Sequence, residues 1–384
     1  MDKKIIAFDA KRAAQNRTGL GNYSRFIVRL LSLYAPDNDY RLFVPNLRKT
    51  RFLDELPTPS AYTIVSPRTV LGRAMKALWR SFAISHELRR QHVDLYHGLS
   101  NELPFGIRHA GCRSIVTIHD VIFLHHPEYY RPLDRWLYRL KFAYAGRKAD
   151  CVLTVSEYSK RELVQHLHLP PSKIRVVYQG ITIDFSSVTD TDLRRVQSLY
   201  RLPDRFILFV GTLEERKNLL LVARAFVLLA AKHSLPPDLR LVAVGRRTPY
   251  LSTVLSTLQA AGLTDRLLIC EGVPFADLPA FYRLADFFVY PSRIEGFGIP
   301  MLEAAAAGLP AIGCTGSSLE EAGGAGAFYV DPDDVPAMAQ CILSLWNNAD
   351  LRKERSDMGR AHAERFSDSR LFSDLMAVYN SLIG

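Results

Sequence analysis

One stretch of the sequence, residues 287–310, restricts the possible folds of this chain most strongly. An apolar run, Phe287–Tyr290, predicts a buried strand. A loop with two glycines follows, and Pro300 favours the first position of a helix that would cover residues 301–307 and end at Gly308. A strand, a loop and a helix in this order form the repeating unit of parallel α/β folds.

Two carboxylates flank this glycine loop. Glu295 lies in the loop, and Glu303 is expected in the first turn of the helix. Free backbone amides and the helix dipole at such a helix start favour an anionic or oxygen-rich ligand. A carboxylate there can accept hydrogen bonds from two ribose hydroxyls, but a glutamate at this position often only caps the helix. These residues alone leave both interpretations open.

The Glu-x7-Glu spacing from Glu295 to Glu303, with Gly-Phe-Gly-Ile-Pro between them, resembles the family 4 glycosyltransferases. These are retaining enzymes that use nucleotide sugars. The resemblance implies the GT-B fold, an α/β architecture of two facing Rossmann-like domains with a cleft between them. It covers essentially the whole chain and is most specific over residues 206–218 and 267–321.

The length and the element pattern agree with two domains. A chain of 384 residues is long for one domain, and strands alternate with helices in both halves, which favours parallel sheets. We expect an acceptor domain over residues 1–190 and a nucleotide-sugar donor domain over residues 191–368. As the GT-B resemblance implies, the last helix, within residues 369–384, would pack back on the first domain.

Positive charge is concentrated in the first half of the chain. Residues 1–190 hold 29 lysines and arginines against 17 aspartates and glutamates, whereas the remainder holds 20 against 22. No nucleic-acid motif is present, so a membrane surface or a lipid-phosphate acceptor fits this charge better. Two basic segments with helical apolar spacing, residues 68–90 and 131–148, could lie on an anionic membrane or simply pack on their own domain.

The cysteines and the apolar runs indicate a cytoplasmic protein, with the inner face of the cytoplasmic membrane as an alternative location. The five cysteines are scattered without zinc-binding spacing, as expected for reduced thiols. No signal peptide is evident, and no apolar run approaches the ~20 residues of a membrane-spanning helix. The acidic run Asp331-Pro-Asp-Asp334 favours a turn and a helix cap over a metal site.

In the first half, two segments are candidate substrate contacts. The loop around Gly19 and Gly21 is not a dinucleotide fingerprint, because Ser24 replaces the third glycine. The resemblance implies that it approaches the donor diphosphate, although a tight turn explains the same residues. His119 and Asp120 end a predicted strand, where ligands collect in parallel sheets. The family's histidine here contacts the transferred sugar, whereas a strand-end histidine bonded to the backbone is the plainer alternative.

In the second half, a strand ending at Gly211 precedes a loop that carries Arg216 and Lys217 beside a predicted helix start. Both cations could hold a diphosphate, or they could form a solvated surface turn. Thr212 stands where the family commonly has an arginine, so Arg216 is the expected substitute. The resemblance also implies that the backbone around Val273 contacts the nucleobase.

The predicted catalytic residues are therefore His119, Glu295, Lys217 and Arg216. The predicted substrate-binding residues are Gly19, Gly21, Asp120, Gly211, Thr212, Val273, Gly296, Phe297, Gly298, Ile299 and Glu303, and we expect no metal and no cofactor. The resemblance implies a front-face reaction in which the leaving diphosphate helps to deprotonate the acceptor.

The expected reaction moves a hexosyl group to a glycan or lipid-linked acceptor in surface polysaccharide or lipopolysaccharide biosynthesis. GDP-mannose is the first choice of donor and a UDP-sugar the second. Two other classes remain open. One is a nucleotide-sugar epimerase of the same fold, and the other is a catalytically silent protein that binds sugar or lipid.

Overall fold

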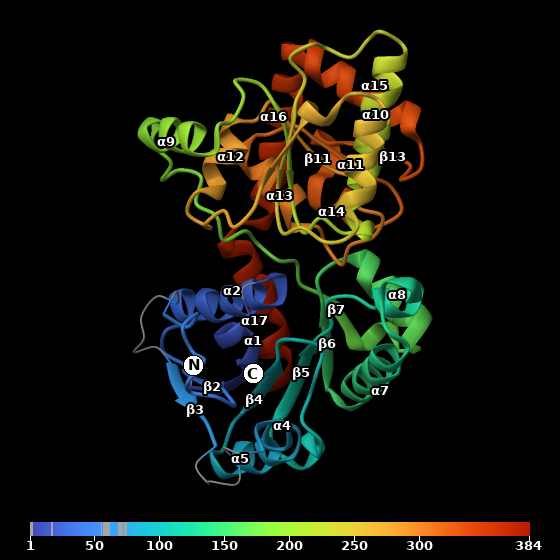
Figure 1. Ribbon diagram of the computed structural model, residues 1–384. Helices are drawn as coiled ribbons and strands as arrows, with labels where there is room; N and C mark the ends of the chain where they lie inside the picture. Colours follow the sequence, from blue (N-terminus) through green and yellow to red (C-terminus); the bar gives the residue numbers. More distant parts are fainter. Residues whose placement is uncertain (1–2, 17, 55, 57–61, 68–71, 73–74) are drawn as a thin grey trace. The chain divides into compact units, whose positions relative to one another are not determined.

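The computed structural model describes residues 3–16, 18–54, 56, 62–67, 72 and 75–384 (Figure 1). The chain divides into two compact units. Unit 1 contains Met1–Thr182 together with Ser367–Gly384, and unit 2 contains Ile183–Phe366. The expected boundaries lay after residues 190 and 368, a few residues beyond those of the units.

The described residues of unit 1 form a sheet of seven strands in the order β3-β2-β1-β4-β5-β6-β7, and all neighbouring strands are parallel. The strands are β1 (Ile5–Asp9), β2 (Asp39–Phe43), β3 (Tyr62–Val65), β4 (Leu95–Gly98), β5 (Arg113–Thr117), β6 (Cys151–Thr154) and β7 (Ile174–Val176). The chain extends the sheet from β1 toward β3 and then returns to add β4 on the other side of β1.

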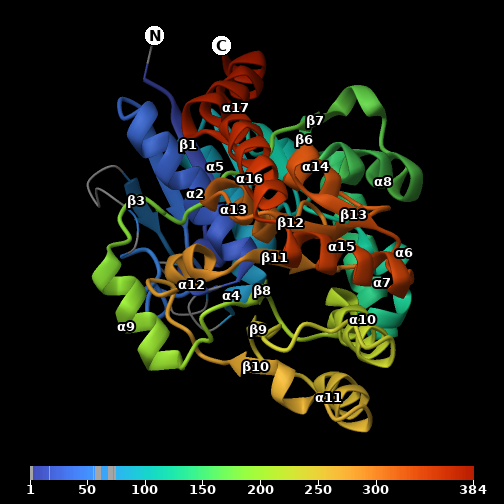
Figure 2. The same ribbon diagram turned by 90° about the horizontal axis from the view of Figure 1, so that it is seen from above.

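Helices accompany this sheet, and the last of them comes from the end of the chain. They are α1 (Lys11–Gln15), α2 (Gly19–Tyr34), α4 (Lys76–Leu78), α5 (Ile84–Arg90), α6 (Ile122–His125), α7 (Pro132–Lys148), α8 (Glu157–Leu167) and α17 (Asp368–Ile383). Helix α17 lies beside α2 (Figure 2), where Arg29 forms an ion pair with Asp368 at 2.9 Å.

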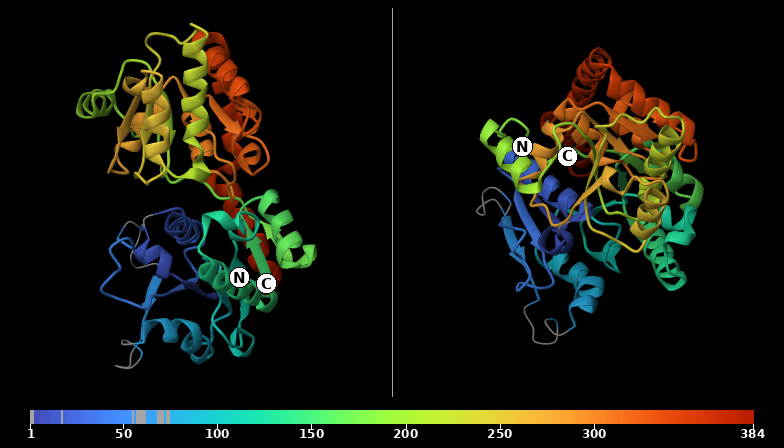
Figure 3. Two further views of the ribbon diagram at one scale, coloured as in Figure 1. Left: turned by 45° about the vertical axis from the view of Figure 1, so that its right-hand side comes forward. Right: turned by 45° about the horizontal axis from the view of Figure 1, so that its top comes forward.

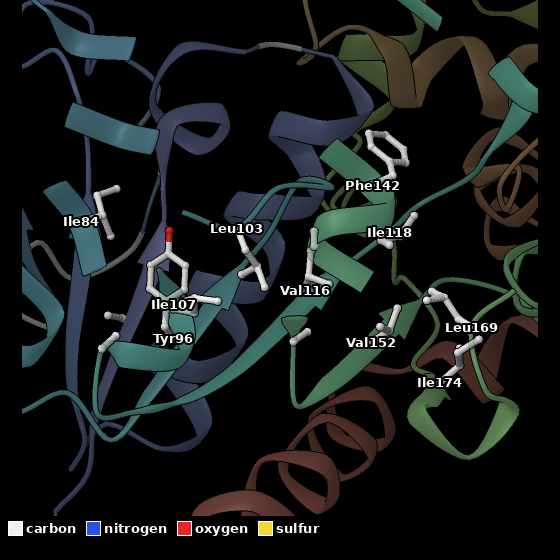
Figure 4. Close-up of a cluster of buried hydrophobic side chains, with 14 of the residues drawn as sticks. Ile84, Tyr96, Leu103, Ile107, Val116, Ile118, Phe142, Val152, Leu169 and Ile174 are labelled. Carbon is white, nitrogen blue, oxygen red and sulfur yellow. The ribbon is translucent and has the colours of Figure 1, made fainter. Parts of the chain in front are cut away.

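The core of unit 1 fills the space between the sheet and its helices. Tyr96 of β4, Val116 of β5, Phe142 of α7 and Ile174 of β7 belong to one cluster of buried side chains (Figure 4). These side chains are buried. The near-continuous apolar runs of the strands follow from burial on both faces of a parallel sheet.

The helix predicted over residues 68–90 is not continuous. Residues 68–71 and 73–74 lie outside the described residues. The described part contains α4, then a π-helical turn over Trp79–Ala83, then α5. In the π-helical turn, Arg80 contacts Asp9 at 2.5 Å at the end of β1. A π-helical turn interrupts regular side-chain spacing, which the apolar periodicity could not reveal.

Unit 2 has a parallel sheet of six strands in the order β10-β9-β8-β11-β12-β13. The strands are β8 (Ile207–Val210), β9 (Leu241–Val244), β10 (Leu267–Cys270), β11 (Phe287–Tyr290), β12 (Ala311–Cys314) and β13 (Phe328–Val330). The helices are α9 (Asp190–Tyr200), α10 (Leu219–Ala231), α11 (Leu251–Ala260), α12 (Leu278–Leu284), α13 (Ile299–Ala307), α14 (Leu319–Gly323), α15 (Val335–Asn347) and α16 (Ala349–Ala363).

The helices of unit 2 cover both faces of its sheet (Figure 3). Helix α10 packs against α11 and α15, whereas α13 packs against α12, α14 and α16. Each βαβ crossover is right-handed by default, so a reversal of strand order places the following helices on the opposite face. In the described part of the chain, no helix combines the length and the apolarity that a membrane span requires.

Candidate active site

The reversal of strand order in unit 2 falls between β8 and β11. From β8 the chain builds outward through β9 to β10, and it then returns to place β11 on the other side of β8. In open parallel sheets, ligands bind beyond the carboxyl ends of the two strands that flank such a reversal. The loops that follow these two strands carry Arg216, Lys217 and Glu295, so the structure brings three of the four predicted catalytic residues together.

The Glu295 carboxylate lies between the two predicted cations. Its Oε1 is 2.5 Å from Lys217 Nζ, and its Oε2 is 2.9 Å from Arg216 Nη1. Ser292 Oγ donates a hydrogen bond of 2.6 Å to Oε1, and Lys217 also contacts the hydroxyl of Tyr290. We call Arg216, Lys217 and Glu295 the charge clamp. The pattern predicted these charges, but it did not predict that one carboxylate holds both cations.

The clamp is a buried set of charges. Burial raises the pKa of Glu295, but the charges of Arg216 and Lys217 outweigh that effect and hold its pKa at about 2. Burial lowers the pKa of Lys217, and the Glu295 carboxylate opposes that change. Glu295 is therefore ionised at neutral pH and fixes the positions of both cations.

The two loops also hold each other through the backbone. Arg293 N donates to the Arg216 carbonyl at 2.9 Å, and Arg216 Nη1 donates to the Ile294 carbonyl at 2.8 Å. Arg216 Nη2 donates to Glu214 Oε1 at 2.9 Å. Several hydrogen-bond donors of Arg216 are thus bound to other residues of the protein. This supports a role for Arg216 in positioning the two loops, in addition to any direct contact with a ligand.

Two helices begin at this edge of the sheet. Helix α10 follows Lys217 directly after Asn218, and α13 follows Gly298, with no side-chain cap at either start. Gly298 has a φ of 99°, and a Cβ there would lie 2.5 Å from Leu319 Cδ2, so any other residue would strain the backbone and require Leu319 to move. Two uncapped helix starts beside two cations are suited to an anion such as a diphosphate.

The sequence placed Glu303 in the first turn of the helix, but the helix starts one residue earlier than expected. Helix α13 begins at Ile299, so Pro300 lies beyond the first helical position and Glu303 lies in the second turn. The cause is Gly298, whose left-handed conformation sets the helix start. Glu303 is buried, and its Oε2 accepts a hydrogen bond of 2.7 Å from the Tyr282 hydroxyl. Burial raises the pKa of Glu303 to about 7, against the opposing effect of this bond.

Among the other predicted site residues of unit 2, Gly211 matters through its backbone, and Phe297 packs in the core. Gly211 has a φ of 155° and lies close to Gly245, which follows the end of β9. A Cβ on Gly245 would lie 1.8 Å from the Gly211 carbonyl oxygen. Thr212 follows Gly211. Phe297 is buried, and its ring centroid lies 5.6 Å from that of Phe366, so its side chain belongs to the core.

Gly296 precedes Phe297 in the loop, and Ile299 is the first residue of α13. Val273 follows β10 and is half-buried. The nucleobase contact at Val273 and the sugar contacts of residues 296–299 remain predictions.

In unit 1, Gly19 and Gly21 lie within the first turn of α2, not in a loop before it as expected. A Cβ on Gly21 would lie 1.8 Å from the Asn16 carbonyl oxygen, whereas one on Gly19 would meet nothing within 4 Å. Gly21 therefore allows α1 and α2 to approach each other. The sequence placed the helix start late because glycine is a weak helix former.

His119 follows the end of β5 and is buried. Its Nε2 donates to the Leu99 carbonyl at 3.0 Å, and its ring meets the ring of Tyr23 edge-on with centroids 4.5 Å apart. Burial lowers the pKa of His119 to about 4, so the imidazole is neutral at physiological pH. The backbone bond matches the plainer alternative for this residue, and Asp120 Oδ1 accepts from Ile122 N at 3.2 Å at the start of α6.

A buried polar network beside His119 was not foreseen. His97 Nδ1 contacts the Tyr379 hydroxyl at 2.7 Å, and His97 Nε2 contacts Thr117 Oγ1 at 2.7 Å. The Tyr23 hydroxyl is 3.0 Å from the same Thr117 oxygen. The short run Asp94-Leu-Tyr-His97 gave only one signal, a histidine at the end of an apolar strand, because its partner Tyr379 lies 282 residues away.

Sequence profiles of two families match the two halves of the chain. The profile "Glycosyltransferase Family 4" matches residues 25–185, and "Glycosyl transferases group 1" matches residues 190–365. The chain belongs to the family 4 glycosyltransferases. This membership agrees with the resemblance in the Glu295–Glu303 stretch, and the protein is a retaining glycosyltransferase.

Two relatives from Escherichia coli are informative. The chain is 29% identical over 380 residues to O-antigen chain mannosyltransferase B, and the match covers 95% of this chain and 96% of the relative. It is 32% identical over 278 residues to the serotype-specific mannosyltransferase WbdA, and this match covers 71% of this chain and 34% of that relative.

Solved structures show the same fold over the whole chain. A glycosyltransferase from Rickettsia africae superposes with a TM-score of 0.76 at 17% identity, covering 100% of this chain and 99% of the other. Anabaena HepE in complex with UDP superposes with a TM-score of 0.75 at 16% identity, covering 99% and 100%. The protein therefore has the GT-B fold that the sequence indicated, with one parallel sheet in each unit.

Proposed function

We propose that this family 4 glycosyltransferase moves a mannosyl group from GDP-mannose to a growing glycan, with retention of the anomeric configuration. The observation that carries the proposal is the charge clamp at the strand-order reversal of unit 2, between two uncapped helix starts. The mannosyl donor rests on the likeness to the two mannosyltransferases of Escherichia coli.

In this proposal the clamp stabilises the leaving diphosphate. Positive groups that are fixed before the reaction need no rearrangement as charge develops, which is where electrostatic catalysis is strongest. Lys217 and the amides of α10 and α13 would face the diphosphate, and Glu295 would hold both cations in place. Removing one such donor typically lowers turnover by ~10²–10³.

Glu303 would hold the ribose of the donor. A buried carboxyl with a raised pKa is poorly satisfied by the protein alone, and ribose hydroxyls would stabilise its ionised form. The change Glu303→Ala should then weaken the binding of GDP and of GDP-mannose. Equal affinity of the variant and the wild type for GDP would exclude the ribose role.

The acceptor would be a glycan, and a lipid-linked one would bring the protein to the inner face of the membrane. Helix α7 carries Leu133, Trp136 and Leu140, whose side chains are exposed, among the basic residues Arg135 and Arg139. Apolar and basic side chains together can bind an anionic lipid surface. Co-sedimentation with anionic vesicles, compared between the wild type and Trp136→Ser, tests this contact.

The reaction itself is tested by incubating the protein with GDP-mannose and an acceptor glycan and measuring GDP release and product configuration. We expect GDP release that depends on the acceptor and an α-linked product from the α-linked donor. Turnover with UDP-sugars alone would show that the donor is a UDP-sugar and not GDP-mannose. Conversion of the donor sugar without acceptor would favour the epimerase, and binding without turnover would favour the silent protein.

A further inference from the structure

A cluster of two histidines and one glutamate lies in unit 1, on elements that the proposed transfer reaction does not use directly. His125 is the last residue of α6, and Glu162 and His166 are one turn apart on α8. Residues four apart on a helix share one face, so Glu162 and His166 point the same way. One ligand atom from each of the three residues lies within 4.8 Å of the other two.

The distances suit a tetrahedral metal ion. Glu162 Oε2 is 3.0 Å from His125 Nδ1 and 3.4 Å from His166 Nε2. Ligands at 2.0–2.1 Å from a tetrahedral zinc ion are separated by roughly 3.3 Å. Two of the three edges of such a site therefore already have the required length, and only the two imidazoles need to approach each other.

The charges of the cluster are incomplete without a cation. Glu162 is only 8% exposed. Among the residues that the structure describes, no lysine or arginine forms an ion pair with it, and its two ionic partners are imidazoles that carry a charge only when protonated. His166 Nε2 is buried and has no hydrogen-bond partner among the described residues. Buried charges normally require a fixed opposite charge, and a buried ring nitrogen requires a partner.

We propose that His125, Glu162 and His166 bind a divalent transition-metal ion, with Zn²⁺ as the expected ion. Two imidazoles and one carboxylate form a ligand set that suits Zn²⁺ and related ions, whereas Mg²⁺ prefers an all-oxygen octahedral site. Three protein ligands leave the fourth tetrahedral position to water. The sequence pattern does not reveal this set, because His125 lies far along the chain from the Glu-x3-His spacing of residues 162–166.

The position of the site indicates a structural role. Helix α6 begins three residues after His119, and Ser159 of α8 donates to the His119 carbonyl at 3.0 Å. A metal bound between α6 and α8 would join the two elements that hold His119. The ion would then stabilise unit 1 without contacting the substrates.

The experiment uses the untagged full chain, stripped of metal with a chelator and titrated with ZnCl₂ by calorimetry, followed by Co²⁺ titration with visible absorption. We expect one equivalent of Zn²⁺ to bind, tetrahedral Co²⁺ absorption to appear, and Zn²⁺ to raise the unfolding midpoint. Mg²⁺ should produce none of these effects. His125→Ala, at an exposed position, should lower Zn²⁺ affinity by at least ~100-fold, because even outer partners of a ligand contribute 10–100-fold.

His86→Ala, an exposed histidine of α5, serves as the matched control and should bind Zn²⁺ as the wild type does. The variants Glu162→Gln and His166→Ala test the other two ligands, and circular dichroism checks that each variant folds. If Glu162→Gln does not fold, His125→Ala and His166→Ala still decide the outcome. Equal Zn²⁺ affinity in the wild type and His125→Ala would overturn the proposal. So would the absence of tetrahedral Co²⁺ absorption in the wild type, which would leave the cluster as direct contacts between Glu162 and the two histidines.

Discussion

At the residue scale, the structure shows that Glu295 is held by the protein itself, while its predicted catalytic role remains a prediction. Both of its oxygens are bonded, one to Lys217 and Ser292 and the other to Arg216. A carboxylate engaged in this way has little capacity left for a ligand. The sequence located the three charges, but the pairing depends on two loops that are 78 residues apart and could not be read from either loop.

Lys217→Met should destabilise the protein by up to about 3 kcal/mol. This is less than the usual cost of leaving a buried charge unpaired, because Arg216 still neutralises Glu295. A double-mutant cycle with Glu295→Gln, followed by urea unfolding, should give a coupling of about 1–3 kcal/mol. The exposed pair Arg247 and Glu271, at 2.6 Å, is the control and should couple by less than about 1 kcal/mol. Equal coupling in both pairs would show that the clamp is not a buried unit.

Glu303→Gln should change the pH dependence of stability. The pKa of Glu303 is raised from 4.5 to about 7 in the folded protein, so its contribution is fully present below pH 4.5 and is lost as the pH rises through 7. The glutamine variant should therefore be more stable than the wild type at pH 8, by about 1–3 kcal/mol, and the difference should vanish near pH 4. Urea unfolding at several pH values measures it, and a difference independent of pH would contradict the assignment.

At the element scale, the alternation of strands and helices was predictable because each element has its own apolar period. The strand at residues 287–290 and the helix end at Gly308 both occur as expected. The starts of α2 and α13 were predicted too late. Each start lies beside a glycine in a close approach, Gly21 in the first turn of α2 and Gly298 directly before α13, and local propensity does not contain such approaches.

Gly298→Ala tests the start of α13. Alanine at this position would have a φ of 99° and a Cβ 2.5 Å from Leu319 Cδ2. Gly316, with a φ of 86° and nothing within 4 Å of its Cβ position, supplies the matched control for backbone strain alone. We expect Gly316→Ala to cost about 1 kcal/mol and Gly298→Ala to cost about 1–3 kcal/mol more. Equal losses in thermal unfolding would show that Leu319 adjusts freely.

At the scale of the whole molecule, the end of the chain completes unit 1. The Tyr379 hydroxyl of α17 reaches His97 at the end of β4, and both side chains are fully buried. Burial, with a smaller effect of His119, lowers the pKa of His97 to about 3, so this network holds a neutral imidazole. Sequence reasoning expected the last helix to pack on the first domain but had no means of naming the polar contact that it makes.

Tyr379→Phe should destabilise the protein by about 1–3 kcal/mol, because it leaves a buried ring nitrogen of His97 without a partner. Tyr34→Phe is the control, since Tyr34 is exposed and stacks on Phe372, and it should cost less than about 0.5 kcal/mol. Denaturant unfolding compares the two. A similar small effect of both changes would mean that α17 is held by apolar packing alone.

We propose that the loops at the strand-order reversal of unit 2 bind a guanosine diphosphate sugar. The most direct measurement is thermal unfolding of the wild type and Glu303→Ala with GDP, UDP, CDP or ADP. A ligand at a hundred times its dissociation constant stabilises by about 2.7 kcal/mol, which corresponds to roughly 5–10 °C for domains of this size. We expect such a shift with GDP for the wild type and a much smaller one for Glu303→Ala. A shift with UDP alone would contradict the donor, and no shift with any nucleoside diphosphate would contradict the site.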